Sequence, residues 1–327
     1  MNWSTQRVLV TGAGGFVGSH LAERLVTLGA TTTALVRYNS LGSWGWLDES
    51  PLKGEMNVVA GDICDRDQLQ AIVRGHDVVF HLAALIAIPY SYRAPVSYVR
   101  TNVEGTVNVL QAALDSGVGR TIVTSTSEVY GTARTVPIRE DHPLQPQSPY
   151  AATKVAADSL AEAFRRSFGL SVRILRPFNT YGPRQSSRAV IPTIITQAIG
   201  GQPIRLGHLT PTRDFVYVAD TVDGFIAMAE RDDDPDGVVH LGTGRETAIG
   251  DLAQTIRALL GSQAPIVTDA ERERPDASEV ERLCADATRA RDLLGWTPRH
   301  SLEEGVGETI EWVKQNLHRY RPGVYGI

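Results

Sequence analysis

The chain has 327 residues, of which 42% are hydrophobic and 21% charged, with a formal net charge of −5. This length predicts about two domains, and the composition excludes disordered, collagen-like and disulfide-scaffold proteins. The acidic balance argues against a nucleic-acid-binding surface, which has to be basic to meet phosphates. Two cysteines, Cys64 and Cys284, are too few for a disulfide framework, and no CxxC pair indicates a metal site.

No stretch of the sequence approaches the roughly 18 apolar residues that a transmembrane helix needs. The N-terminal segment also lacks the long apolar core of a signal peptide. We therefore expect a cytoplasmic protein that contacts neither a membrane nor nucleic acid.

In the first half of the chain, short β-branched runs alternate with amphipathic segments. Strands are expected over residues 7–12, 31–36, 56–62, 77–84, 120–127 and 171–177. Helices are expected over residues 17–28, 66–74, 98–116 and 149–168. Unbroken apolar strands separated by helices are typical of a parallel sheet covered on both faces. We therefore predict an α/β, Rossmann-type doubly wound sheet, whose ligands bind at the carboxyl ends of its strands.

The second half is less regular. Strands are expected within 213–220 and 238–244, helices over 221–231, 249–261 and 302–317, and a charged loop over 269–282. We interpret this half as a smaller, interleaved C-terminal α/β domain. The predicted division assigns residues 1–178 and about 214–240 to the first domain, and 179–327 mainly to the second.

A GxxGxxG motif follows the first predicted strand and precedes a predicted helix. In a dinucleotide site, one glycine permits a tight turn, one lets the backbone approach the pyrophosphate, and one lets the helix pack closely on the strand. The N–H groups at the start of the helix then point at the phosphates. The predicted cofactor residues here are Gly12, Gly15, Phe16, Val17 and Gly18.

Arg37 stands about 20 residues beyond the glycines, where an NAD site usually has an acidic residue. Because a guanidinium pairs with a 2′-phosphate, Arg37 favours NADP and leaves NAD possible. Residues at the ends of the third and fourth strands should also border the cofactor: Asp62, Ile63, Leu82, Ala83 and Ala84.

Tyr150 and Lys154 are four residues apart at the start of a predicted helix and therefore share one face. A nearby ammonium favours the phenolate, so we expect Lys154 to lower the pKa of Tyr150 towards that of a general base. The YxxxK spacing is common by chance. Here, however, it follows a strand that ends in Thr126, Ser127 and Glu128, which predicts one catalytic site for all five residues.

The sequence resembles the extended short-chain dehydrogenase/reductase family, specifically its NAD(P)-dependent sugar-nucleotide epimerases and dehydratases. The likeness covers nearly the whole chain and is carried by GxxGxxG at 12–18, HLAA at 81–84, Asn102, STSEVYG at 125–131, YxxxK at 150–154, RPFNTYGP at 176–183, RDF at 213–215 and LLGWTP at 293–298. The resemblance implies further cofactor contacts from Asn102, Ser125 and Pro177. It also implies a homodimer through a four-helix bundle formed by the helices near 98–116 and 149–168.

Glu128 narrows the range of family members that the sequence resembles. The run Thr126-Ser127-Glu128 is similar to that of GDP-mannose-type 4,6-dehydratases and of UDP-glucuronate decarboxylases, whereas simple 4-epimerases usually lack the acid. Many dTDP-glucose dehydratases have Asp where Ser127 stands, which leaves the general acid open among Glu128, Ser127 and a bound water. Further segments resemble dehydratases of the legionaminic acid pathway: residues 38–47, 83–92, 143–150 and 184–195.

The resemblance implies a dehydratase acting on UDP- or GDP-linked N-acetylglucosamine, with a nucleotide-diphosphate sugar held by Asn179, Arg188, Arg213 and Arg274. Three alternatives stay open. A UDP-glucuronate decarboxylase needs a basic pocket for the C6 carboxylate, which the sequence does not identify. A 4-epimerase would make Glu128 incidental. A non-catalytic NADP-sensing protein would have no use for the complete Thr/Glu/Tyr/Lys set.

Overall fold

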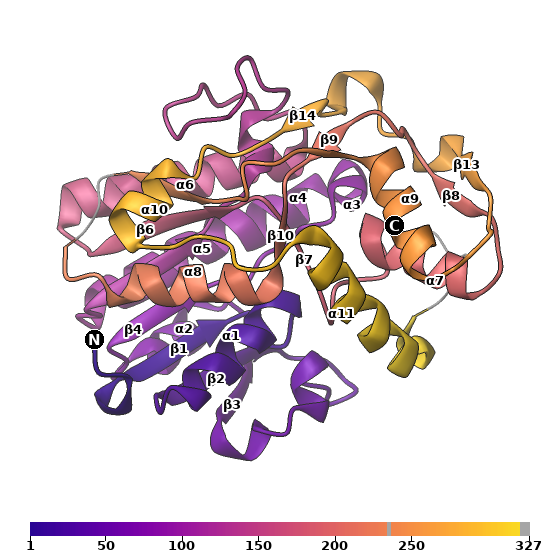
Figure 1. Cartoon of the computed structure of the whole chain (residues 1–327). Coiled ribbons are helices and arrows are strands. Elements are labelled where there is room, and N and C mark those ends of the chain that lie inside the picture. The colour runs from indigo at the N-terminus through magenta and orange to yellow at the C-terminus, as the bar shows by residue number, and fades with distance from the viewer. Residues whose placement is uncertain (234–236, 321–327) are drawn as a thin grey trace.

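A computed structural model describes residues 1–233 and 237–320 of the chain. Within this part, seven parallel strands form the main sheet in the order β3-β2-β1-β4-β5-β6-β11 (Figure 1). Their bounds are Arg7–Thr11 (β1), Thr31–Arg37 (β2), Asn57–Gly61 (β3), Val78–His81 (β4), Arg120–Thr124 (β5), Val172–Pro177 (β6) and Val238–Leu241 (β11). This order and the helices on both faces confirm the predicted Rossmann-type fold.

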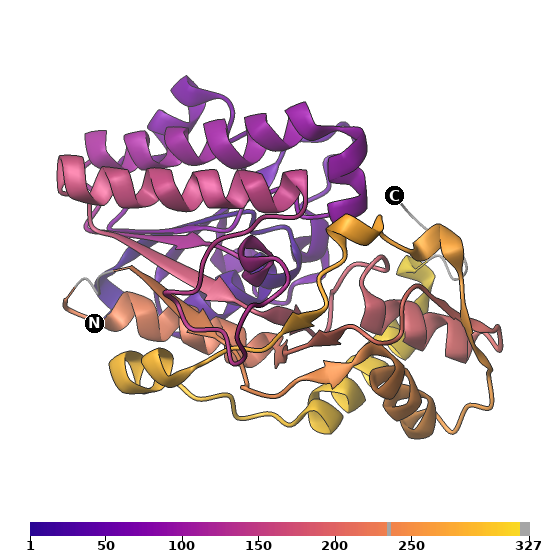
Figure 2. The ribbon, with the colours of Figure 1, turned by 90° about the horizontal axis from the view of Figure 1, so that it is seen from above.

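Helices cover both faces of the sheet. One face carries α2 (Arg66–Val73), α5 (Gly105–Asp115) and α6 (Pro149–Phe168), and the other carries α1 (Phe16–Thr27), α8 (Val218–Glu230) and α10 (Thr288–Leu294). Figure 2 shows α5 and α6 lying side by side along their length. In the described part of the chain, no helix combines the length and the apolar run that crossing a bilayer requires.

Helix α6 has the predicted bounds because its end signals are local. Ser148 caps it by accepting a hydrogen bond from the Ala151 N–H, Pro149 occupies its first position, and Gly169 ends it with a φ of +69°. The helix expected over 98–116 is instead broken into α4 (Pro95–Tyr98), a π-helical turn (Val99–Glu104) and α5, and α3 (Ile88–Arg93) precedes it.

In the C-terminal part, the helices expected over 249–261 and 302–317 are present, whereas a further helix and most of the short strands were not predicted. Its helices are α7 (Val190–Ile199), α9 (Ile249–Leu259) and α11 (Leu302–Gln315). Its small sheets pair β7 (Asn179–Tyr181) with β10 (Phe215–Tyr217), β8 (Ile204–Leu206) with β13 (Ile266–Thr268), and β9 (Thr212–Arg213) with β12 (Thr247–Ala248) and β14 (Arg282–Leu283). The strand expected within 213–220 is present but short, as β10, because α8 already begins at Val218.

Several short 3₁₀ turns connect these elements. They are η1 (Trp3–Thr5), η2 (Gly45–Glu49), η3 (Lys53–Glu55), η5 (Ser127–Tyr130), η6 (Ala270–Arg272), η7 (Asp276–Ser278) and η8 (Leu317–Arg319). Turn η5 follows β5 directly, and η6 and η7 lie in the predicted charged loop. Two of the motifs singled out in the sequence therefore lie on connections rather than on regular elements.

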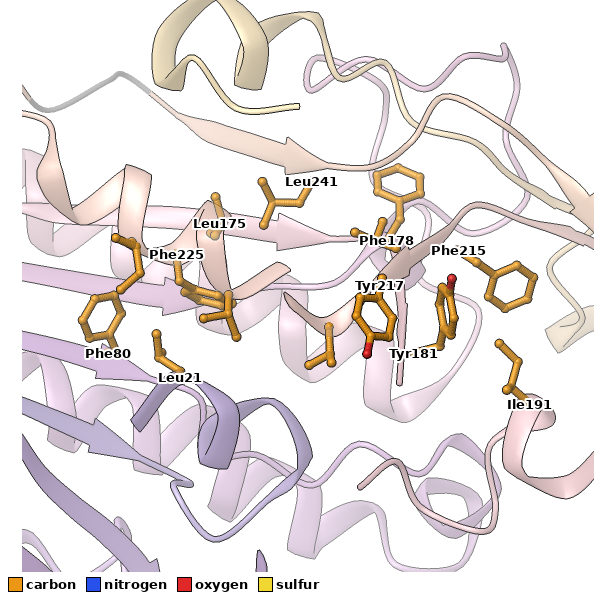
Figure 3. Packing of buried hydrophobic residues seen from close by; sticks show 14 of the residues in the cluster. Leu21, Phe80, Leu175, Phe178, Tyr181, Ile191, Phe215, Tyr217, Phe225 and Leu241 are labelled. Atoms are coloured by element: carbon orange, nitrogen blue, oxygen red, sulfur yellow. The ribbon is translucent and has the colours of Figure 1, made fainter. Parts of the chain in front are cut away.

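One continuous hydrophobic core joins the two parts of the molecule. It extends from Leu21 and Phe80 beside the main sheet to Phe215 and Ile191 in the C-terminal part (Figure 3). Apolar burial of this kind is the main stabilising contribution to a fold. The C-terminal part consequently packs firmly beyond the carboxyl ends of the strands (Figure 1), where a ligand of the main sheet is expected.

Candidate active site

The glycine motif forms a tight turn between β1 and α1. Gly12 has a φ of +72°, and a Cβ built on it would lie 2.8 Å from the Ala83 nitrogen. A Cβ on Gly18 would lie 2.2 Å from the Gly12 oxygen, so the close contact of helix and turn requires glycine. Beside Gly15, by contrast, the only close atom is the Gly12 oxygen at 3.2 Å. The free N–H groups of the first turn, at Phe16 and Val17, therefore adjoin space that a pyrophosphate fits.

Main-chain contacts shape the rest of this wall. The Thr11 hydroxyl accepts hydrogen bonds from the N–H groups of Leu82 and Ala83, at 3.2 and 3.1 Å, and so fixes the chain as it leaves β4 towards Ala84. His81 lies between the hydroxyls of Thr11 and Thr106, at 2.9 and 3.0 Å. Burial lowers the pKa of His81 to about 3, so the ring is neutral and structural.

The predicted adenine end lies beyond β2 and β3. Arg37 is exposed at the end of β2, opposite Gly61 of β3. Asp62 accepts a hydrogen bond from the Cys64 N–H at 2.9 Å, which holds the turn after β3. Ile63 is buried, and a Cβ on Gly105 would lie only 2.5 Å from its Cδ1. The exposed guanidinium is thus free to meet a charged group on the ribose.

A neighbouring segment that the sequence analysis did not assign supports the glycine turn. The Trp46 N–H donates to the Gly14 oxygen at 3.0 Å. A Cβ on Gly14 would lie 2.6 Å from the Trp44 oxygen, so the two chains are in direct contact. The ring of Trp46 packs on Trp312 of α11, with 5.2 Å between centroids. Helix α11 therefore supports the cofactor site from outside.

Tyr150 and Lys154 lie on one face of α6, as predicted. Tyr150 is only 7% exposed, and this burial raises the pKa of its phenol, while a hydrogen bond with Thr126 acts in the opposite direction. Lys154 is also buried, which lowers the pKa of its ammonium, and its Nζ donates to the Thr124 oxygen at 2.6 Å. The expected lowering of the Tyr150 pKa is therefore not seen in the chain alone, where loss of solvent is the largest influence on the phenol.

Turn η5 brings the remaining catalytic candidates to Tyr150. The Thr126 hydroxyl accepts a hydrogen bond from the Glu128 N–H at 3.3 Å and also contacts the Tyr150 hydroxyl. The charge of the Glu128 carboxylate acts on the same phenol. Ser127 is buried between them in sequence. The site thus holds the phenol of Tyr150, the hydroxyl of Thr126 and the carboxylate of Glu128, which suits proton transfer at neighbouring positions of a substrate.

The four predicted substrate residues have different surroundings. Arg213 is buried and donates to the Val280 oxygen at 2.7 Å, while its Nη2 lies 3.3 Å from the Glu279 carboxylate. Arg274 lies 3.7 Å from the carboxylate of Glu128. Arg188 is exposed and lies 3.4 Å from Ser186, and its charge acts on Tyr98, whose ring packs on Tyr150.

Two of these residues have buried polar atoms without a hydrogen-bond partner among the described residues. They are Oδ1 of Asn179 and Nη1 of Arg274. Buried polar atoms are nearly always hydrogen-bonded in a complete structure. These two atoms are therefore the positions at which a polar ligand is expected.

A buried ion pair below Lys154 was missed. Asp158, one further turn along α6, pairs with Arg176 of β6 at 2.6 Å, and both are almost fully buried. The Ser125 hydroxyl donates to Asp158 at 2.5 Å, and Arg176 donates to the Tyr130 hydroxyl. The i, i+4 spacing from Lys154 was a signal for Asp158. Because the hydroxyl of Ser125 is engaged here, its main chain is the part that can contact a cofactor beside Pro177.

Asn102 lies in the π-helical turn, and its amide is fully engaged. Its Oδ1 accepts from the Leu85 N–H at 2.8 Å, and its Nδ2 donates to the Leu85 oxygen and the Thr153 hydroxyl at 2.9 and 3.1 Å. These bonds join the loop after β4 to α6. Asn102 therefore shapes the proposed cofactor site indirectly, by fixing the positions of its neighbours.

Residues 9–309 of this chain match the family model described as GDP-mannose 4,6 dehydratase. Three similar proteins can also be compared with the chain. A UDP-glucose 4-epimerase of Mycolicibacterium smegmatis is 36% identical over 317 residues, which cover 94% of this chain and 98% of the relative. A UDP-N-acetyl-alpha-D-glucosaminuronate decarboxylase of Bacillus cytotoxicus is 34% identical over 322 residues, covering 95% and 98%. The crystal structure of a dTDP-glucose 4,6-dehydratase from Streptomyces venezuelae with NAD bound has a TM-score of 0.87 and 31% identity, covering 96% of this chain and 99% of that chain.

Proposed function

We propose that this chain, which belongs to the GDP-mannose 4,6-dehydratase family, is an NAD(P)-dependent nucleotide-sugar 4,6-dehydratase. The family is one of the extended short-chain dehydrogenase/reductase families, whose enzymes dehydrate, epimerise or decarboxylate nucleotide sugars. Its proposed substrate is a UDP- or GDP-linked N-acetylglucosamine, and its product is the 4-keto-6-deoxy sugar. The observation that carries the proposal is the Glu128 carboxylate beside Thr126 and Tyr150. Dehydration needs a base at C5, which 4-epimerisation does not.

The chain's own residues supply the proton transfers. Tyr150 takes the proton of the sugar 4-hydroxyl, and Thr126 holds the oxygen as it becomes a carbonyl. The 4-ketone acidifies the C5–H, whose proton Glu128 removes as water leaves from C6. A bound nicotinamide would supply the redox chemistry, by holding the C4 hydride until it is delivered to C6, and the protonated Glu128 would return a proton to C5. Ser127, Glu128 and a water remain the candidates for protonating the leaving hydroxyl.

The proposed cofactor residues fit a dinucleotide. The room beside Gly15 and the free N–H groups of α1 suit a pyrophosphate, and Lys154 is placed on α6 to bind the nicotinamide ribose. We propose that the exposed guanidinium of Arg37 favours NADP over NAD, because it can pair with a 2′-phosphate.

The test is mass spectrometry of UDP- and GDP-linked N-acetylglucosamine, glucose and glucuronate after incubation with the enzyme. Loss of water supports the dehydratase, and an isomer of unchanged mass supports an epimerase. Loss of carbon dioxide supports a decarboxylase, and no reaction supports a non-catalytic binding protein. In Glu128→Gln, oxidation at C4 should stay measurable while water loss falls by about 10²-fold or more. Unchanged water loss would remove Glu128 from this role.

One observation favours the decarboxylase as a second candidate. The Arg274 guanidinium lies 3.7 Å from Glu128, which places a cation beside the group proposed to act at C5. A C6 carboxylate needs such a partner. Release of carbon dioxide from UDP-glucuronate, with no water lost from the N-acetylglucosamine substrates, would establish this reading in place of the dehydratase.

We also propose a homodimer formed through α5 and α6, and a division into the two interleaved domains described above. The two helices are neighbours over one face of the sheet, and Val96 and Val99, just before α5, are 66% and 52% exposed. Exposed apolar side chains at such a place are typical of an interface. A monomer in light scattering at micromolar concentration would contradict the dimer.

A further inference from the structure

Glu128 has a charged neighbour, Arg274, besides the phenol of Tyr150. The nearest atoms of its carboxylate and of the Arg274 guanidinium are 3.7 Å apart, and the two side chains are 12% and 24% exposed. Nη1 of Arg274 is buried and has no hydrogen-bond partner among the described residues. The contact is therefore an ion pair without the hydrogen bond that would make it strong.

The main chain that carries Arg274 is anchored on both sides. On one side, the Asp269 N–H donates to the Leu206 oxygen at 2.7 Å. On the other, the Ser278 hydroxyl donates to the Gln147 oxygen at 2.6 Å and contacts the Tyr92 hydroxyl of α3 at 2.5 Å. The segment thus runs from the C-terminal part to the sheet-bearing part (Figure 2). Arg274 can change its partner by turning its side chain, without movement of the segment.

The charges around Glu128 favour a change of partner by Arg274. Arg213 lies close enough for its charge to interact with both Glu128 and Arg274. Its own guanidinium is held by Glu279 and by the Val280 oxygen. The charge of Glu128 acts on Arg213 as well, and its carboxylate is the ion-pair partner of Arg274. A diphosphate offers more negative charge and a geometry that a guanidinium can bind with two hydrogen bonds.

We propose that Arg274 exchanges partners when the substrate binds: it breaks its ion pair with Glu128 and binds the substrate diphosphate instead. In the free enzyme, Glu128 serves as the counter-ion of Arg274. Once the diphosphate has taken that arginine, the carboxylate is released to act at C5. This inference rests on the proposed function, because it takes Glu128 as the base and a nucleoside diphosphate as the ligand. It makes Arg274 a residue that couples substrate binding to the availability of the base.

The experiment is a double-mutant cycle with UDP and GDP as probes, measured by titration calorimetry. Glu128→Gln should tighten binding of the diphosphate by roughly three- to tenfold, because Arg274 then has no ion pair to break before it binds the diphosphate. In an Arg274→Gln background the same substitution should change binding by less than about twofold. Arg274 is partly exposed, so its replacement should leave the fold intact, which a melting curve of each variant checks.

Glu279→Gln is the matched control, because this carboxylate pairs with Arg213. The effect of Glu279→Gln on diphosphate binding should be the same in the wild-type and in the Arg274→Gln background. Equal tightening by Glu128→Gln in both backgrounds, or no tightening, would overturn the exchange while leaving the dehydratase proposal to the mass spectra. If neither UDP nor GDP binds the wild-type chain, both the proposed substrate and the exchange are refuted.

Discussion

The proposed cofactor residues of the sheet-bearing part are fixed mainly by main-chain contacts, whereas the arginines of the C-terminal part are held by carboxylates. Thr11 binds two successive N–H groups after β4, and Gly12 and Gly18 permit close contacts of backbone with backbone. Arg213 and Arg274 instead face Glu279 and Glu128. The first arrangement is ready for its ligand, while the second contains partners that an anion can replace.

The largest expected effect concerns the buried ion pair of the sheet-bearing part. Asp158→Asn would leave Arg176 as an uncompensated buried charge, so we expect the free energy of unfolding to fall by about 3–5 kcal/mol. Chemical denaturation measures it. The control is Asp232→Asn, which removes a fully exposed partner of Arg120 and should cost less than about 1 kcal/mol. Equal losses would show that burial does not distinguish the two pairs.

Acid should destabilise the sheet-bearing part through its buried histidines. Burial lowers the pKa of His81 and His240 to about 3 and that of His20 to about 4, so these rings stay neutral in the folded chain below the usual value near 6.5. The unfolded chain takes up the protons first. Stability is therefore fully present above pH 6.5 and is lost as the pH falls from there towards about 4 for His20 and about 3 for His81 and His240.

A histidine variant isolates this effect from the other titrating groups. In His81→Gln, the free energy of unfolding should fall less steeply below pH 6.5, by about 1.4 kcal/mol per pH unit relative to the wild type. Urea unfolding at pH 7.5, 6.5 and 5.5 measures the two slopes. Parallel slopes would mean that His81 is already protonated in the folded chain.

The smallest expected effect is on cofactor choice at the exposed end of β2. Arg37→Asp should weaken NADPH binding by about tenfold relative to NADH, because it replaces a partner of the 2′-phosphate with a like charge. Fluorescence titration of both cofactors measures the ratio. Arg74→Asp, a change of the same charge at the exposed residue after α2, should leave it unchanged. An unaltered ratio in Arg37→Asp would end the preference for NADP.

Local signals explain how much of the fold could be predicted. Helix α6 was predicted to the residue because Ser148, Pro149 and Gly169 mark its ends within the sequence itself. The glycine turn and the positions of the main strands followed from similarly local patterns. The break before α5 did not, because it depends on Asn102 bonding to Leu85 across a loop.

The candidate site shows the same limit. Spacing on α6 placed Tyr150 and Lys154 on one face, but it could not show that burial governs the pKa of the phenol. The proximity of Arg274 to Glu128 depends on how the two parts of the chain pack, which no local pattern contains. The parallel pairing of β7 with β10, which sets the main chain of Asn179 opposite Phe215, is equally a product of tertiary structure.

The contact of Trp46 with Trp312 has a consequence for protein engineering and for divergence within the family. No residue of α11 belongs to the proposed cofactor site, yet the helix supports the segment that touches Gly14. A chimera that took its last quarter from a relative with a smaller side chain at position 312 would lose that support. The Arg319 guanidinium, 4.6 Å from the centre of the Trp46 ring, would then be the contact that still holds this segment from the C-terminal side.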